Sequence, residues 1–206
     1  MSHFIIVGLG NPGSEYENTR HNTGRILLEA FRQAQDFPEW SFDKKLKALV
    51  SVGQLATCNL QLILPETFMN KSGDAMKNIQ DLRFKIQAKK KEISNLAVIH
   101  DDLDIPFGKF KISWSKSSGG HRGVESIIKA VKTESFVRIR VGISPTTPSG
   151  KMRKPHGEVA VDKHILGKFS PGQLATLKKL SKSISDALVT IVAEGREKAM
   201  SQQGSF

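Results

Sequence analysis

The sequence has 206 residues, of which 38% are hydrophobic and 25% are charged, a composition typical of a soluble globular domain and not of a disordered chain. No apolar run approaches the roughly 20 residues that a membrane helix needs, and a single cysteine, Cys58, excludes an internal disulfide. The net charge of +11 and the isoelectric point near 9.8 favour a polyanionic partner, with nucleic acid first and an anionic membrane second.

Two further features of the composition narrow this prediction. Aromatic residues are few, with one Tyr and two Trp, which favours contacts to phosphates over base stacking. The first residues lead directly into an apolar, strand-like run without a basic region and an apolar core, so we expect no secretory signal and a cytoplasmic protein.

Apolar runs in chain order predict six strands, at residues 4–9, 48–52, 60–64, 96–99, 109–114 and 136–143. The last run alternates apolar and basic residues, which predicts a strand with one face in water. Helical spacing of apolar residues predicts helices at residues 26–34, 70–86, 123–131 and 170–191.

Two stretches lack such periodicity: residues 87–92 are expected to be a loop or helix end, and residues 144–158 a long loop. Strands that alternate with helices predict an α/β fold. We expect a single-domain three-layer sandwich over residues 1–206, with a mixed, mainly parallel sheet flanked by helices.

Three glycines, Gly8, Gly10 and Gly13, match the dinucleotide-binding pattern G-x-G-x-x-G. That site requires a helix that begins inside the motif, whereas Pro12 interrupts it and polar residues continue to Asn22. The sequence also lacks a second strand that ends in an acid about 20 residues further on. The glycines are better interpreted as a tight turn that places the neighbouring Asn11 at a cleft.

Polar side chains follow three predicted strands: Asn11 after the first, Asn70 after the third and Asp101 after the fourth. If these strands are parallel neighbours, the three groups converge at the carboxyl ends of the sheet, where open α/β folds bind ligands. His21, in the loop after the first strand, is within reach of the same crevice. The alternative for each residue is an ordinary turn, a helix cap or a solvated side chain.

Such a set favours hydrolysis by an activated water. The imidazole of His21 is suited to take a proton at neutral pH, and the Asp101 carboxylate is suited to hold it in the useful tautomer. Asn amides are suited to donate hydrogen bonds to a developing oxyanion. The sequence contains no G-x-S-x-G motif, so it does not support a serine nucleophile of that type.

The run His100-Asp101-Asp102-Leu103-Asp104 has a rival interpretation as a Mg²⁺ site of a nuclease. In a continuing strand Asp102 and Asp104 would point the same way. Pro106 favours a turn instead, so we place a metal second and expect neither metal nor cofactor.

Four blocks of the sequence resemble, in order, the signature blocks of bacterial-type peptidyl-tRNA hydrolases: VGLGNPGSEYENTRHNTG, PETFMNKSG, HDDLDIPFGK and GGHRGVESI. FVRIRVGI and DKHILGKFSP extend the resemblance over nearly the whole chain. The resemblance implies a monomeric α/β enzyme without a metal that hydrolyses the ester between a peptide and tRNA.

The resemblance also implies roles for individual residues. His21 would be the catalytic base and Asp101 its orienting partner. The amides of Asn11 and Asn70 would bind the peptide end and position water or the oxyanion, and Phe68 and Met69 would line the peptide channel. The implied substrate-binding residues are Asn11, Tyr16, Phe68, Met69, Asn70, Gly120, His121 and Arg122.

The sequence departs from the family pattern at two positions. Arg122 stands where the fourth block usually has Asn; Arg has no acceptor, so it cannot copy that residue's contacts, and it would grip a tRNA phosphate or point into solvent. Ser113 stands where many members carry a basic residue for the tRNA 5′ phosphate. The side chains that would compensate are Lys111, Lys116, Arg138 and Arg140.

These features favour one hypothesis and leave two alternatives. The first is a cytoplasmic enzyme that recycles tRNA from peptidyl-tRNA. The second is a non-catalytic RNA-binding relative involved in RNA processing, which the Arg122 departure supports. The third is a metal-dependent nuclease centred on Asp101.

Overall fold

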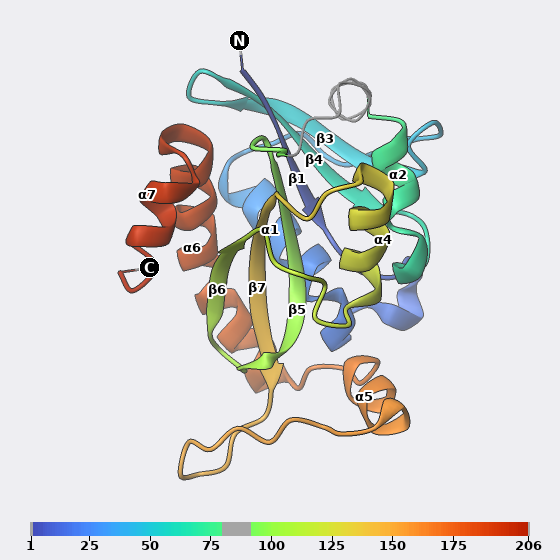
Figure 1. Ribbon diagram of the computed structural model, residues 1–206, viewed down its shortest axis with the longest axis vertical. Coiled ribbons are helices and arrows are strands. Elements are labelled where there is room, and N and C mark those ends of the chain that lie inside the picture. The colour runs from blue at the N-terminus through green and yellow to red at the C-terminus, as the bar shows by residue number, and fades with distance from the viewer. Residues whose placement is uncertain (1, 80–91, 206) are drawn as a thin grey trace.

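The computed structural model describes residues 2–79 and 92–205 and contains a seven-stranded sheet of order β2-β3-β4-β1-β5-β7-β6 (Figure 1). Strands β4, β1, β5 and β7 are parallel at its centre, and β2, β3 and β6 extend it with antiparallel pairs. The expected mixed sheet with a parallel centre is therefore confirmed. The strands are β1 Ser2–Gly8, β2 Ser41–Asp43, β3 Ala48–Leu55, β4 Cys58–Pro65, β5 Leu96–Pro106, β6 Phe110–Trp114 and β7 Val137–Ser144.

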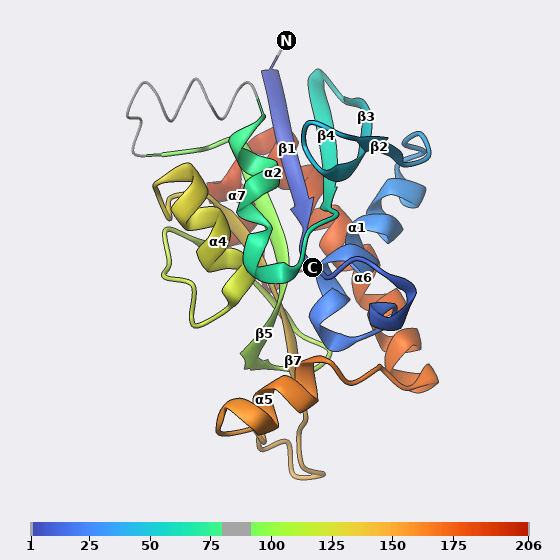
Figure 2. The same cartoon turned by 90° about the vertical axis from the view of Figure 1, so that its right-hand side faces the viewer.

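Helices cover both faces of this sheet, as Figure 2 shows. On one face α1 and α6 bury Leu28 and Leu188 in one apolar cluster, and on the other α2 and α4 bury Met76 and Ile127 in a second. The three-layer α/β sandwich is thus confirmed. The helices are α1 Thr23–Ala34, α2 Gly73–Lys77, α4 Arg122–Val131, α5 Glu158–Ile165, α6 Pro171–Glu194 and α7 Arg196–Ser201, with 3₁₀ turns η1 Ser14–Tyr16, η2 Arg20–Asn22 and η3 Met69–Lys71.

The start of α1 is pressed against the ends of β1 and β5. A Cβ on Gly24 would lie 2.3 Å from the carbonyl oxygen of Ile99 and 2.4 Å from the nitrogen of Leu9, so only glycine permits this approach. The backbone nitrogen of Arg25 donates to the Leu9 oxygen at 3.1 Å. This packing holds the turn η2, which precedes α1, over the carboxyl ends of the central strands.

Strand β5 is longer than its apolar run predicts. It continues through the acidic residues to Pro106, because β7 pairs with it as far as Asp102 and again at Pro106 after a register shift. The predicted helix at 70–86 begins as η3 and α2, and residues 80–91 lie outside the described residues, as does most of the stretch 87–92.

The prediction that one face of the last strand, β7, lies in water is wrong. Arg138 of β7 is only 1% exposed, because the segment after β6 covers it and Ser117 accepts its hydrogen bond at 2.9 Å. Ser170 begins α6 with the expected cap. The short elements β2, α5 and α7 were not predicted. In the case of α5, no residue is fully buried, so the sequence has no apolar stripe that would indicate a helix. No helix in the described part of the chain is long and apolar enough to span a bilayer.

Candidate active site

A cavity of about 520 Å³ opens at the carboxyl ends of β1, β4 and β5. These strands are adjacent and parallel, which was the condition for the predicted convergence of Asn11, Asn70 and Asp101. Every residue of the predicted catalytic and substrate-binding sets lines this cavity: Asn11, Tyr16, His21, Phe68, Met69, Asn70, Asp101, Gly120, His121 and Arg122.

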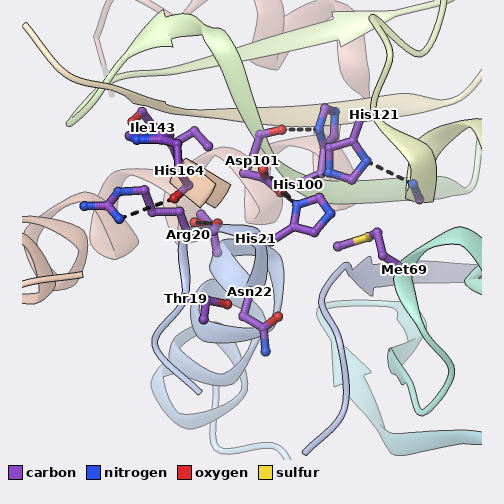
Figure 3. Close-up of polar contacts among 12 residues, drawn as sticks. Thr19, Arg20, His21, Asn22, Met69, His100, Asp101, His121, Ile143 and His164 are labelled. Carbon is purple, nitrogen blue, oxygen red and sulfur yellow. Dashed lines mark hydrogen bonds and ion pairs between the residues drawn. The ribbon is translucent and has the colours of Figure 1, made fainter. Parts of the chain in front are cut away.

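At the floor of the cavity His21 is paired with Asp101 (Figure 3). The Nδ1 atom of His21 lies 3.0 Å from each carboxylate oxygen, and the two residues are 7% and 3% exposed. Since a carboxylate only accepts hydrogen bonds, Nδ1 carries the hydrogen. The other ring nitrogen of His21, Nε2, is therefore the one with a lone pair.

His121 is the second imidazole on the same carboxylate. It is the N-cap of α4, and its Nδ1 atom accepts from the backbone nitrogens of Gly123 and Val124, both at 3.2 Å. The hydrogen of this ring is therefore on Nε2, which donates to Asp101 Oδ1 at 2.9 Å. The sequence analysis grouped His121 with the substrate contacts and missed this bond; its place just before a predicted helix was the available signal.

Electrostatics shift the pKa values of Asp101 and His21 in opposite directions. Burial acts to raise the pKa of Asp101, but the neighbouring His21 and His121 outweigh burial and hold this pKa well below its usual value. Burial also acts to lower the pKa of His21, and the Asp101 carboxylate outweighs it, so the pKa of His21 is raised. Asp162 also acts to raise this pKa, and Arg122 opposes it.

A third histidine, which is buried, contacts both Asp101 and His121. His100 is 1% exposed, and its Nδ1 atom donates to the backbone oxygen of Asp101 at 2.7 Å. Burial holds the pKa of His100 well below its usual value, so the ring is neutral. Its ring centroid lies 4.8 Å from that of His121, so it also limits the movement of that ring.

Asn11 is fixed by two backbone-linked contacts. Its Oδ1 atom accepts from the backbone nitrogen of Met69 at 2.8 Å, and its backbone is joined to the Asn22 side chain by bonds of 2.8 and 2.9 Å. Because Oδ1 is committed to Met69, the Nδ2 hydrogens are the part of Asn11 suited to a ligand. The sequence analysis did not single out Asn22; its place next to His21 was the only signal.

Apolar side chains form two walls of the cavity. On one wall Phe68, 57% exposed, packs edge-on against Tyr16 with ring centroids 6.3 Å apart. The other wall consists of Val161, Ile165 and Leu166, from α5 and the residue after it. These residues were missed because α5 has no sequence signal of its own.

The acidic residues after Asp101 each face a different cation. Asp102 Oδ2 accepts from Arg140 Nε at 2.7 Å, and Asp104 pairs with Lys154. At the rim, Arg122 Nη2 pairs with Glu158 Oε1 of α5 at 2.8 Å, with side chains 59% and 77% exposed. Arg122 therefore spans from α4 to α5 along the edge of the cavity.

The atoms of His21, Asp101 and His121 that face one another lie within 4.8 Å, a spacing that fits a metal ion. A ligating imidazole must offer a lone pair. The Nε2 atom of His121 carries a hydrogen, because Nδ1 accepts from two backbone amides. The arrangement therefore fits a hydrogen-bonded group better than a metal centre.

The predicted tRNA-binding residues divide into exposed and buried ones. Lys111 and Lys116 are exposed, and Lys111 lies directly opposite Arg140 in the β6–β7 pair. Arg138, which was expected to compensate for Ser113, lies beneath the surface at 1% exposure. The prediction that Arg138 lies on a tRNA-binding surface is therefore wrong.

The chain is similar to known proteins over nearly its whole length. The family model for peptidyl-tRNA hydrolase matches residues 5–205. A peptidyl-tRNA hydrolase from Prochlorococcus marinus subsp. pastoris is 35% identical over 98% of this chain and 94% of that protein, and one from Clostridium tetani is 32% identical over 98% of each. The crystal structure of peptidyl-tRNA hydrolase from Acinetobacter baumannii superposes with a TM-score of 0.80 at 27% identity, covering 98% of this chain and 95% of that one.

The family match and the relatives of the chain identify it as an enzyme of the hydrolase class. It belongs to the peptidyl-tRNA hydrolase family, so the resemblance of its sequence blocks is confirmed.

Proposed function

We propose that this chain hydrolyses the ester bond that joins a peptide to the ribose of tRNA, with His21 as the base that activates water. The observation that carries the proposal is the bond between His21 Nδ1 and the Asp101 carboxylate at the floor of the cavity. It leaves the Nε2 lone pair of His21 to accept a proton. Family membership supports the substrate, and the net charge of +11 supports a nucleic-acid partner.

The reaction would proceed in two proton transfers. His21 Nε2 takes a proton from water as the water oxygen attacks the ester carbonyl carbon, and the resulting imidazolium is stabilised by Asp101. The Nδ2 hydrogens of Asn11 donate to the oxyanion of the tetrahedral intermediate. When that intermediate collapses, the bond to the ribose oxygen breaks and His21 returns the proton to it. The products are tRNA with an intact ribose hydroxyl and the free peptide acid, which releases its proton to solvent to become a carboxylate.

The walls of the cavity support a peptide as the acyl group. Phe68 and Tyr16 on one side and α5 on the other offer apolar surface to side chains, while Asn11 and Asn70 offer amide groups to the peptide backbone. We propose that Lys111, Lys116 and Arg140 contact tRNA phosphates, because Lys111 and Lys116 are exposed and Arg140 lies directly opposite Lys111.

We further propose that residues 1–206 act as one domain and as a monomer in the cytoplasm. The side chains of the proposed mechanism, Asn11, His21 and Asp101, all line one cavity of the single chain. Light scattering at the concentration of the assay should give the mass of a single chain, 22.7 kDa.

The experiment that tests the proposal is hydrolysis of N-acetyl-aminoacyl-tRNA by the wild-type chain, with and without a chelator. We expect release of the N-acetyl amino acid and intact tRNA at a rate that the chelator does not change. Binding of the tRNA without release would favour the RNA-binding alternative. Cleavage of the tRNA chain that a chelator abolishes would favour the nuclease.

A further inference from the structure

Arg20, the residue before His21, reaches away from the cavity floor toward the end of α5 (Figure 3). Its Nη1 atom donates to the backbone oxygen of Gly167 at 3.0 Å and to that of His164 at 3.4 Å. Its Nη2 atom donates to Oε1 of Gln173 at 3.2 Å, and the guanidinium lies 5.4 Å from the ring centroid of Phe169. One side chain thus contacts α5, α6 and the connection between them.

The backbone around Arg20 makes the same connection. The nitrogen of Arg20 donates to Gly167 at 3.1 Å, and the nitrogen of Phe169 donates to Asn18 at 2.8 Å, with a β-bridge between Thr19 and Lys168. A Cβ at Gly167 would lie 2.8 Å from Arg20 Nη1, so a side chain there would displace the guanidinium. The turn that carries His21 and the α5–α6 connection are therefore one packed unit.

Helix α5 depends on such contacts because none of its residues is fully buried, although the partly buried Ile165 at its carboxyl end packs against the core. At its carboxyl end, Nε2 of His164 donates to the backbone oxygen of Ile143 at 2.9 Å, next to the bonds from Arg20. At its amino end, the exposed Glu158 pairs with Arg122. An exposed ion pair contributes little. The position of α5 is therefore set mainly at the end that Arg20 holds.

We propose that Arg20 is a positioning residue that sets the distance between the His21 imidazole and the apolar wall of the cavity carried by α5. Arg20 is joined to His21 through the backbone and to the α5 wall through Gly167 and His164, so one side chain fixes both. An acyl group seated against Val161 and Ile165 would then present its ester carbon at a fixed distance from the water held by His21. This inference rests on the proposed function, which supplies the reaction that the distance serves.

Arg20 acts through the geometry of its hydrogen bonds and not through its charge. Among the described residues no carboxylate pairs with Arg20; its hydrogen-bond acceptors are two backbone oxygens and one amide oxygen. A planar guanidinium reaches these separated acceptors from two nitrogens at once, whereas the single ammonium of lysine cannot span them. Arg20→Lys therefore keeps the charge and removes the geometry.

The test compares Arg20→Lys with Arg32→Lys as a matched control. Arg32, 5% exposed on α1, also bonds a backbone oxygen, that of Phe37, but lies outside the cavity. We expect kcat of Arg20→Lys for N-acetyl-aminoacyl-tRNA to fall about ten-fold or more with KM nearly unchanged, because a small misplacement of reacting groups costs this much. Arg32→Lys should lose stability but keep kcat. If Arg20→Lys does not fold, Arg20→Gln takes its place.

A second readout needs no substrate. The groups that face His21 are Asp101 of β5, His121 and Arg122 at the start of α4, and Asp162 of α5. Asp101 and Asp162 act to raise the pKa of His21. If Arg20 positions both the turn and α5, its loss alters these contacts and the burial of the ring, and the pKa of His21 measured by NMR should shift in Arg20→Lys and not in Arg32→Lys.

These readouts separate the inference from the proposed function. Absence of hydrolysis by the wild-type chain would defeat the proposed function, while the NMR comparison would still test whether Arg20 positions His21. A kcat that falls only with the fraction of folded protein, together with an unchanged His21 titration, would overturn the inference.

Discussion

The carboxylate of Asp101 receives hydrogen bonds from two imidazoles, with His121 Nε2 at 2.9 Å and His21 Nδ1 at 3.0 Å. His121 is held in turn by the amides of the first turn of α4. The orientation of Asp101, and through it the tautomer of His21, therefore depends on where α4 begins.

This dependence can be tested by replacing His121. Asn is a good N-cap residue, so His121→Asn should keep the cap of α4, whereas His121→Ala should lose about 1 kcal/mol more of the unfolding free energy. Both variants remove the bond to Asp101, and both should lower kcat about ten-fold or more. Urea unfolding and steady-state kinetics measure the two effects. A wild-type kcat for His121→Asn would show that Asp101 needs no second imidazole.

The raised pKa of His21 fixes the sign of the pH dependence. The base acts in its neutral form, so kcat/KM should fall as the pH drops through a midpoint above the ordinary imidazole value of about 6.5. Asp101→Asn removes the main group that raises this pKa and leaves burial and Arg122, which lower it, opposed among the described residues by Asp162 alone. Its midpoint should therefore move to lower pH, in addition to any loss of rate. Profiles of kcat/KM against pH that share one midpoint would contradict this account.

The Arg122–Glu158 pair should affect catalysis more than stability. Both side chains are largely exposed, so Arg122→Asn and Glu158→Gln should each change the unfolding free energy by less than about 1 kcal/mol. Each breaks the same contact between α4 and α5, so the two should change kcat/KM in the same direction. The double variant should add little to either single variant. Effects that add fully would show that the pair does not act as a unit.

The basic residues should differ in their contribution to tRNA binding. Lys111 is exposed, so Lys111→Ala should weaken binding and reduce the slope of log K against log salt by about 1. Arg138 is buried, so Arg138→Met should leave that slope unchanged. Filter binding over a range of salt concentrations measures both. An equal loss of slope in the two variants would mean that Arg138 reaches the RNA.

Much of the fold followed from local patterns in the sequence. The run 4–9 and the spacing of Leu27, Ala30 and Phe31 predicted β1 and α1, because the core of an α/β protein imposes these periods directly. The convergence of Asn11, Asn70 and Asp101 followed from the order of strands alone. The pairing of β4, β1 and β5 confirmed it.

Other features depend on contacts between distant parts of the chain and left no local signal. Helix α5 is held by Arg20 and by the backbone of Ile143, and not by an apolar stripe. Its sequence therefore shows no helical spacing of apolar residues. The burial of Arg138 depends on the segment after β6 folding over it. To predict that His21 and His121 both bond the Asp101 carboxylate, one would need to know where α4 begins relative to β5.

The most direct test of the central claim is hydrolysis of N-acetyl-aminoacyl-tRNA by His21→Ala, measured together with its affinity for tRNA. We predict that kcat falls by at least about 100-fold, the contribution of a general base, while the affinity stays near that of the wild-type chain. A His21→Ala variant that hydrolyses the ester at the wild-type rate would contradict the account.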